Sequence, residues 1–118
     1  MDERILVWTW DIDNSIKEVD LFFDGQPKIY KEFENNLMLK RAIQRNLEII
    51  GEAMNRILKR DSSMEQYYSD ARAIVGLRNQ IIHGYDTLSD DRIWAIVINR
   101  LPILRSETSA FLEKYGDL

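Results

Sequence analysis

The chain has 118 residues, of which 45% are hydrophobic and 31% charged, as in one ordinary soluble domain, so we expect residues 1–118 to form a single unit. It has no cysteine, which excludes disulfides and thiolate metal sites, and its apolar runs are far too short to span a membrane. The net charge of −4 argues against a general nucleic-acid coating protein, and the N-terminus lacks a signal-peptide pattern, so we expect a cytoplasmic location.

Charge is distributed unevenly along the chain. Residues 2–24 hold seven acidic and two basic side chains, a net charge of −5, whereas residues 38–60 hold six basic and two acidic ones, a net charge of +4. A locally basic face can meet RNA phosphates. The plainer interpretation is a solvated helix surface, and the sequence leaves both open.

Residues 2–23 are predicted to form the first helix, because apolar side chains recur there at spacings of three and four. These side chains are Ile5, Trp8, Ile12, Ile16, Val19 and Phe23. Trp8 and Trp10 fall on different faces, so one is expected in the core and the other at a subunit contact. Residues 24–27 (Asp-Gly-Gln-Pro) should break the helix, and residues 31–35 should be a polar approach to the next one.

A second helix is predicted from about residue 36 to residue 59, with a seam of Leu39, Ile43, Leu47, Ile50, Met54 and Ile57. Another face carries four charged residues that can pair with one another: Arg41, Arg45, Glu48 and Glu52. Gly51 lies inside this helix at a cost of roughly 1 kcal/mol relative to alanine. A glycine there indicates that another backbone packs closely against it.

The second half of the chain is predicted to hold two more helices. After a loop at residues 61–63, where Ser62 or Ser63 fits a capping box, a third helix should run through Tyr67 and Tyr68 to about residue 82. Ser89 or Asp90 should cap a fourth helix, ended by Gly116 and kinked near Ile98 by the ring of Pro102. We therefore expect an all-α antiparallel four-helix bundle, with a fifth helix where Pro102 divides the last one.

The third helix carries the residues best suited to chemistry. On an ideal helix Arg78 lies in the middle of the apolar face, with Tyr85 nearly beneath it. An unpartnered guanidinium in that position is costly, so Arg78 should face a carboxylate or an anion-binding cleft. Glu48 and Glu52 are the available carboxylates, and a purely structural Arg–Glu pair is the plain alternative to a functional arginine.

His83, the only histidine, lies five residues after Arg78 and two before Tyr85. It is separated from Arg78 by about 140° around an ideal helix, so one helix face does not hold both. Gly84 can distort the helix end, and a symmetric dimer can bring two such stretches to one cleft. A lone histidine is usually structural, but histidine is also the side chain best suited to proton transfer near neutral pH.

Arginine and histidine together suit phosphodiester cleavage. Arg78 can hold a phosphate through its guanidinium fork, and His83 can exchange a proton with the RNA 2′-hydroxyl or with the leaving oxygen. With one histidine, no cysteine and no dense carboxylate motif, the sequence offers no obvious metal site. We expect neither a metal nor a cofactor.

At these residues the chain resembles a known family. The segment Arg-Asn-Gln-Ile-Ile-His-Gly-Tyr at residues 78–85 matches the R-x4-H-x-Y motif of the HEPN superfamily, and most closely the HepT toxins, also called DUF86. Residues 49–53 (Ile-Ile-Gly-Glu-Ala) look like that family's IGEA segment. Residues 76–77 (Gly-Leu), Trp94 and residues 101–104 (Leu-Pro-Ile-Leu) are also similar to it, so the likeness covers about residues 39–105.

The resemblance implies a HEPN-like bundle and a metal-independent endoribonuclease toxin of a type II toxin–antitoxin system. In that family Arg78 and His83 would carry catalysis, with Asn79 as a supporting residue. Tyr85 would receive AMP units from a nucleotidyltransferase antitoxin called MNT, and this anionic group would compete with RNA phosphate beside Arg78. The implied partners are RNA, MNT and a second copy of the chain that shares the cleft. Neither DNA nor a membrane is expected.

Two other hypotheses remain open on the sequence alone. The protein could be a non-catalytic helical subunit that binds a nucleotidyltransferase, which would suit its acidic charge and aromatic faces. It could also be a plain structural bundle in which Arg78 pairs with Glu52, a residue that we otherwise expect to support the site. In the last case Arg78→Ala should cost several kcal/mol, as a broken buried pair does.

Overall fold

The computed structural model describes residues 1–82 and 89–116, and these residues are almost entirely helical. The elements, in chain order, are α1 (Glu3–Phe22), α2 (Tyr30–Glu34), α3 (Leu37–Arg60), the 3₁₀ helix η1 (Ser62–Tyr67), α4 (Ala71–Ile82), α5 (Asp90–Ala95), the π-helical turn η2 (Ile96–Arg100) and α6 (Leu101–Tyr115). No strand occurs among them. The all-α prediction is confirmed.

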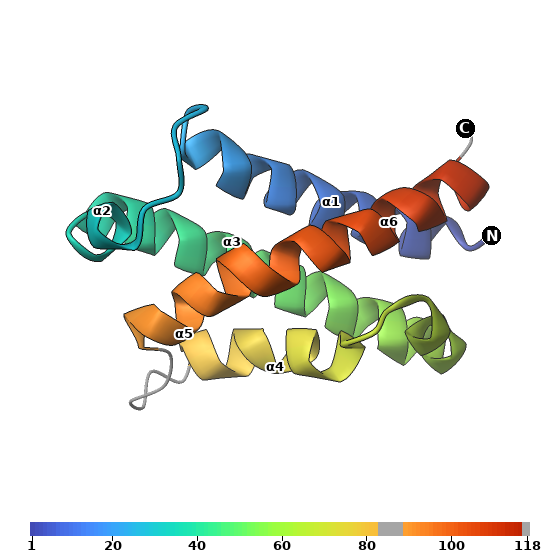
Figure 1. Cartoon of the computed structure of the whole chain (residues 1–118). Coiled ribbons are helices and arrows are strands. Elements are labelled where there is room, and N and C mark those ends of the chain that lie inside the picture. Colours follow the sequence, from blue (N-terminus) through green and yellow to red (C-terminus); the bar gives the residue numbers. More distant parts are fainter. Residues whose placement is uncertain (83–88, 117–118) are drawn as a thin grey trace.

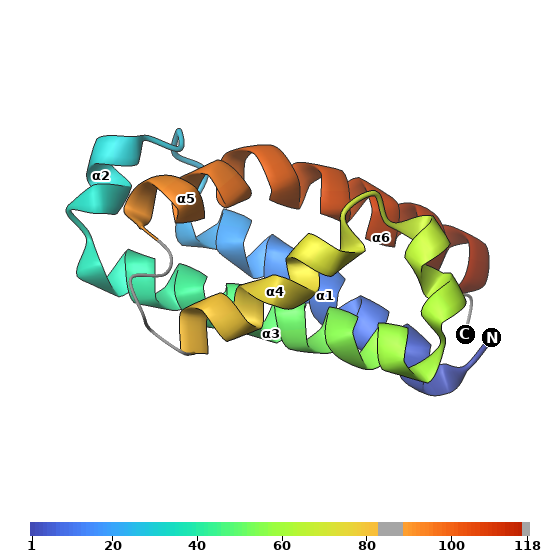
Figure 2. The ribbon, with the colours of Figure 1, turned by 90° about the horizontal axis from the view of Figure 1, so that it is seen from below.

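Four long segments alternate in direction and enclose one apolar core (Figure 1). They are α1, α3, α4 and the continuous α5–η2–α6 segment, and both ends of the chain lie at the same end of the bundle. α3 is central: it packs against α1 on one side and against α4 on the other, while α6 packs against α1. Contact between α4 and α6, which Figure 2 shows from below, is slight in the described residues. A surface hollow lies along this seam of the bundle.

The first helix begins and ends as its sequence predicts. The Asp2 carboxylate accepts hydrogen bonds from the backbone N–H groups of Arg4 and Ile5, which caps α1. Beyond its end, Asp24 and Gly25 take positive φ angles of 49° and 72° and reverse the chain. The predicted polar approach at residues 31–35 is instead the short helix α2, because Phe33 is fully buried and anchors it to the core.

The predicted third helix is wrong in its first half. The chain forms η1 and then leaves helical geometry at Tyr68, whose φ and ψ are −128° and 128°. This extended step places the Tyr68 side chain in the core, only 4% exposed, before α4 begins at Ala71. The cap is also different, because the Asp61 carboxylate accepts the Ser63 N–H and hydroxyl in place of the predicted serine capping box.

The predicted distortion before Pro102 is confirmed. Pro102 lies in the first turn of α6, and the turn before it, η2, widens to π-helical hydrogen bonding over Ile96–Arg100. The wider turn accommodates the proline ring, which would otherwise crowd the Ile98 carbonyl. Ser89 caps α5 by accepting the Arg92 N–H, and Gly116 lies at the end of α6, both as predicted.

The two tryptophans of α1 do occupy different environments. Trp8 is half-buried against the core, whereas Trp10 is 37% exposed on the outer face. Within the described part of the chain, no helix is both long and apolar enough to cross a membrane.

Candidate functional site

The candidate site begins where α4 crosses α3 at Gly51. A Cβ atom added to Gly51 would lie 2.9 Å from the Arg78 backbone nitrogen and 3.0 Å from the Ile74 carbonyl oxygen. Any larger residue would push the two helices apart. The prediction that a backbone packs closely on Gly51 is therefore confirmed, and that backbone is the turn of α4 that carries Arg78.

The close crossing places Arg78 beside Glu52, the residue that follows Gly51. Arg78 Nε lies 2.5 Å from Glu52 Oε2, while Glu52 Oε1 lies 3.1 Å from Arg56 Nε one turn later on α3. One carboxylate therefore bridges two guanidinium groups from different helices. Glu52 Oε2 is buried, yet no described group meets hydrogen-bond geometry with it, so charge rather than an aligned hydrogen bond holds Arg78 there.

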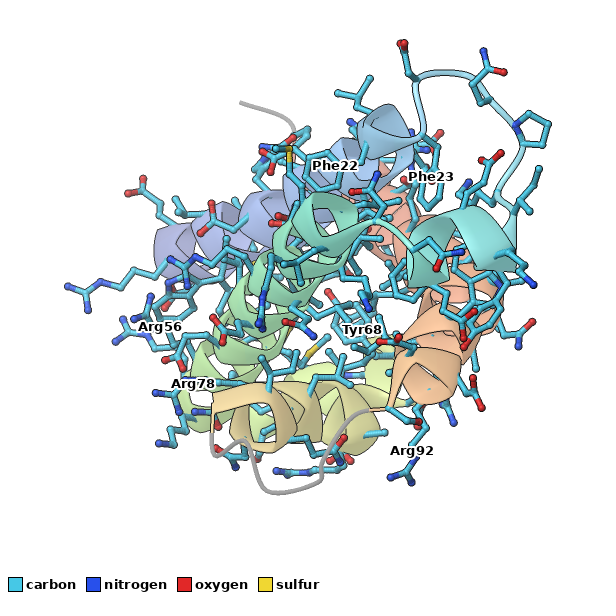
Figure 3. All side chains as sticks on the ribbon, turned by 90° about the vertical axis from the view of Figure 1, so that its left-hand side faces the viewer. Phe22, Phe23, Arg56, Tyr68, Arg78 and Arg92 are labelled. Atoms are coloured by element: carbon cyan, nitrogen blue, oxygen red, sulfur yellow. The ribbon has the colours of Figure 1, made fainter. Side chains whose placement is uncertain are left out.

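These side chains line a surface hollow of about 400 Å³ between α1, α3 and α4, which we call the Glu52 hollow. Its charged residues are Asp11, Arg45, Glu48, Glu52, Arg56 and Arg78. Arg45 Nη1 contacts Glu48 Oε2 at 3.2 Å, so the hollow holds three cations and three anions arranged largely in pairs. Figure 3 shows Arg56 and Arg78 projecting from the same side of the molecule.

Arg78 lies at the rim of the core rather than inside it. The helical projection predicts the middle of the apolar face, but the Arg78 side chain is 42% exposed and that of Glu52 is 28% exposed. The apolar neighbours Ile74 and Leu77 face inward, and the long arginine side chain reaches past them to the hollow. An ion pair this exposed to solvent contributes about 1 kcal/mol or less to the free energy of unfolding.

The structure describes three of the five predicted site residues. It brings Arg78 and Glu52 together, and it places Asn79 on the exposed side of α4. His83 and Tyr85 lie outside the described residues. His83 directly follows Ile82, the last residue of α4, so the motif continues from the same helix that presents Arg78.

Sequence reasoning missed Arg56 as a member of this cluster. The sequence does indicate the Arg56–Glu52 pair, because Arg56 follows Glu52 by four residues and this spacing places the two side chains on one face of a helix. The unpredicted part is the sharing of one carboxylate, since only the α3–α4 crossing shows that Arg56 and Arg78 meet at Glu52.

Comparisons with known proteins agree with this architecture. A family model described as "Ribonuclease HepT-like" matches residues 12–111. The chain is 38% identical over 78 residues to "Putative RNase MJ1380" of Methanocaldococcus jannaschii, covering 66% of this chain and 71% of that protein. It is 31% identical over 103 residues to "Putative RNase MJ0125" of the same organism, covering 87% and 80%.

A bacterial relative is similar as well. "Putative RNase TTE0752" of Caldanaerobacter subterraneus subsp. tengcongensis is 30% identical over 87 residues, covering 72% of this chain and 75% of that protein. No solved structure matches the chain significantly. The family model covers α1 from Ile12 through most of α6 and includes both Glu52 and the motif. The chain therefore belongs to the HepT-like ribonuclease family.

Proposed function

We propose that the protein is an endoribonuclease that cleaves RNA with His83 and Arg78 and without a metal ion. The observation that carries the proposal is the Arg78–Glu52 contact: it holds an arginine at an open hollow, five residues before the only histidine, in a chain of a ribonuclease family. Histidine can move the proton of the 2′-hydroxyl and arginine can stabilise charge on the phosphate, which are two of the roles in transphosphorylation of RNA.

The proposed reaction uses the substrate's own 2′-hydroxyl. His83 accepts the 2′-hydroxyl proton as the 2′-oxygen attacks the adjacent phosphorus, and the P–O5′ bond breaks. The departing 5′-oxygen takes a proton from water, and His83 releases the proton that it accepted to solvent, which leaves a 2′,3′-cyclic phosphate and a 5′-hydroxyl. Arg78 stabilises the negative charge that accumulates on the phosphoryl oxygens in the transition state.

Glu52 acts as a positioning residue in this proposal. It contacts Arg78 through Nε, so the two terminal Nη groups of the guanidinium remain for a bidentate contact with phosphate. Arg56 shares the same carboxylate, and its positive charge offsets that of Glu52 near the incoming anion. Asn79 is proposed to support the site from the next position on α4.

Regulation is proposed to act at Tyr85. Transfer of AMP to its hydroxyl by a nucleotidyltransferase antitoxin would add phosphate and bulk two residues after His83. The added anion would compete with RNA phosphate for Arg78, so the modified protein would not cleave RNA. Two copies of the chain are proposed to share the cleft in which these motifs meet.

The direct test is the His83→Ala variant. It should lower the rate of RNA cleavage by about 10²- to 10⁴-fold, the usual contribution of a general acid–base residue. Expression of this variant should also cease to arrest growth, and circular dichroism should show an unchanged helical fold. If wild-type protein leaves RNA intact at high concentration and its expression is harmless, the ribonuclease proposal fails.

A second candidate function is that of a non-catalytic subunit that binds the nucleotidyltransferase. It is favoured by the outer face of α1, where Val7, Trp10 and Leu21 are exposed by 56%, 37% and 72% among acidic neighbours. An exposed apolar stripe of this kind marks an interaction surface. A stable complex together with an inactive wild-type protein in the RNA cleavage assay would select this candidate.

A further inference from the structure

A second hollow lies on the other side of α4, in the open seam between α4 and the α5–η2–α6 segment. Its volume is about 710 Å³, larger than that of the Glu52 hollow. Its apolar floor is formed by Ile74 and Leu77 from α4 and by Ile96 and Ile103 from the facing segment. We call it the arginine groove.

The described lining of the groove is positively charged. Arg72, Arg92 and Arg100 line it, and none of the described residues in its lining is a carboxylate. Arg72 reaches Glu65 at 3.3 Å and Arg100 contacts Asp70, and both of these acids lie outside the lining of the groove. Arg92 makes no salt bridge within residues 1–82 and 89–116, so it is the cation most available to an anionic ligand.

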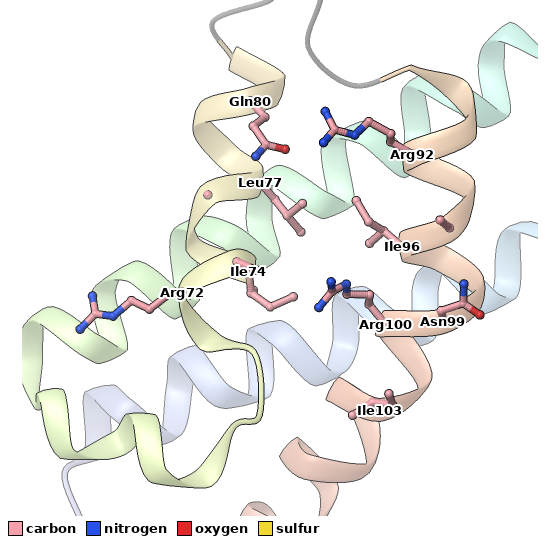
Figure 4. A pocket seen from close by; sticks show the side chains of 12 residues that line it. Arg72, Ile74, Leu77, Gln80, Arg92, Ile96, Asn99, Arg100 and Ile103 are labelled. Carbon is pink, nitrogen blue, oxygen red and sulfur yellow. The ribbon is translucent and has the colours of Figure 1, made fainter.

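Figure 4 shows how the two walls face each other. Arg92 of α5 points across the groove toward Gln80 of α4, and Arg100 of η2 points toward Ile74. Gln80 and Arg92 mark the end of the groove nearest the C-terminal end of α4, where the chain continues to His83. A ligand in the groove would thus approach the catalytic motif along α4.

Gly76 supplies an independent observation. It lies in the middle of α4 on the groove wall, and a Cβ added to it would meet only the Gln80 side-chain nitrogen, at 3.8 Å. Glycine in a helix interior is disfavoured relative to alanine, and here no packing within the described chain requires it. At Gly51 the neighbouring helix explains the glycine, whereas at Gly76 no described neighbour does, and the glycine leaves room for a ligand to approach the α4 backbone.

We propose that the arginine groove binds the backbone of single-stranded RNA that leads to the cleavage site. The proposal rests on the ribonuclease function and adds a binding path to it. Arg92 and Arg100 contact phosphates, the isoleucine and leucine floor packs against riboses or base faces, and Gln80 and Asn99 offer amides to base edges.

The dimensions and charge of the groove favour RNA over a second copy of the chain. From residue 72 to residue 80 the α4 axis advances about 12 Å, the length of roughly three stacked nucleotides. A symmetric dimer built on this surface would place two sets of three arginines against each other with no carboxylate among the described lining residues. A strand of phosphates supplies the missing negative charge.

The test measures RNA binding apart from cleavage. A short fluorescein-labelled single-stranded RNA of mixed sequence is titrated with protein carrying His83→Ala, and anisotropy gives Kd over a series of salt concentrations. Adding Arg92→Glu should weaken binding at least tenfold and reduce the slope of log Kd against log salt by about 0.7, the loss expected for one phosphate contact on a single strand. Arg92→Lys should retain most of the affinity.

Two further variants guard against indirect effects. Arg4→Glu makes the same charge change on the exposed side of α1, outside the groove, and should change Kd by less than about twofold because distant surface charges are screened. Gly76→Leu fills the groove wall without changing charge and should weaken binding by about the same factor as Arg92→Glu. Sedimentation of every variant reports its oligomeric state.

The outcomes separate this proposal from the ribonuclease proposal. If the His83→Ala protein binds RNA and Arg92→Glu and Gly76→Leu leave Kd unchanged, the groove is not the RNA path, while the ribonuclease function stands. If the two groove variants turn a dimer into a monomer and RNA affinity is unchanged, the groove is an interface between copies and the proposal is overturned. If no RNA binds and wild-type protein cleaves none, both proposals fall.

Discussion

The two sides of α4 are built in opposite ways from similar residues. The Glu52 hollow contains three arginines and three carboxylates, and its walls are brought together by Gly51. The described lining of the arginine groove contains three arginines and no carboxylate, and a Cβ at its glycine, Gly76, would make only an ordinary contact with the Gln80 side chain. One helix thus separates a hollow whose lining holds both arginines and carboxylates from a groove whose described lining holds arginines alone. Two of those arginines pair with acids outside the lining, and Arg92 makes no salt bridge within the described residues.

This difference corresponds to two tasks that RNA cleavage requires. Stabilising a transition state requires an arginine held in one orientation, and the partly buried carboxylate of Glu52 provides that restraint. Attracting a long polyanion requires positive charge that the protein itself does not neutralise. We therefore assign the chemical step to the Glu52 hollow and the binding of the strand to the arginine groove.

Removal of the Glu52 carboxylate should greatly lower the rate of RNA cleavage. In Glu52→Ala the guanidinium groups of Arg56 and Arg78 lose their shared anchor, and misplacement of Arg78 should lower the single-turnover cleavage rate about 10²-fold. Glu48→Ala, one turn earlier on α3, removes a carboxylate whose one salt bridge within the described residues is to Arg45, and should lower the rate less than about threefold. Equal losses of cleavage rate in the two variants would show that the rate depends on the total charge of the hollow and not on the contact between Glu52 and Arg78.

Gly51→Ala should disrupt the crossing that builds the Glu52 hollow. Its new methyl group would press on the backbone of α4, so the free energy of unfolding should fall by about 1–3 kcal/mol. Urea denaturation followed by circular dichroism measures this change. Unaltered stability would mean that α4 does not approach Gly51 as closely as the structure shows.

Gly76→Ala should change the free energy of unfolding in the opposite direction. The new methyl group makes only an ordinary contact with the Gln80 side chain and the helix gains intrinsic propensity, so the free energy of unfolding should rise by up to about 1 kcal/mol. The same urea experiment measures both glycine variants side by side. Destabilisation by Gly76→Ala would reveal packing within the chain at this point and would remove the glycine argument for the groove.

Arg78→Ala should have the smallest effect on stability and yet a large effect on cleavage. The half-exposed ion pair with Glu52 is worth about 1 kcal/mol or less, so thermal unfolding should shift by only a few degrees. A loss of several kcal/mol would instead support the structural-pair hypothesis, in which Arg78 serves only to neutralise a buried glutamate.

Much of the fold follows from local sequence. Helical periodicity predicts the ends of α1 and α3 to within about a residue. The sequence also predicts the Ser89 cap of α5 and, from Pro102, the position of the distorted turn η2. The break at Tyr68 is not predictable in this way, because an aromatic residue in a helical pattern carries no sign that its backbone becomes extended. The burial of Phe33, which stabilises α2, is likewise a tertiary effect.

The candidate site is predictable only in part. Gly51 indicates a close helix crossing, and the position of Arg78 calls for a carboxylate, so the Arg78–Glu52 pair is expected from the sequence. Three features depend on how the helices are arranged in space. They are the exposure of Arg78, the salt bridge that Arg56 also makes to Glu52, and the orientation of Arg92 toward Gln80 across the groove. No pattern within one helix contains that information.

The most direct test of the division between the two sides of α4 is a comparison of Arg78→Ala with Arg92→Ala in steady-state RNA cleavage. Arg78→Ala should lower kcat by about 10²-fold or more with little change in KM, as for an interaction made in the transition state. Arg92→Ala should raise KM several-fold and leave kcat near that of the wild type. A fall in kcat for Arg92→Ala, together with an unchanged kcat for Arg78→Ala, would contradict the assignment.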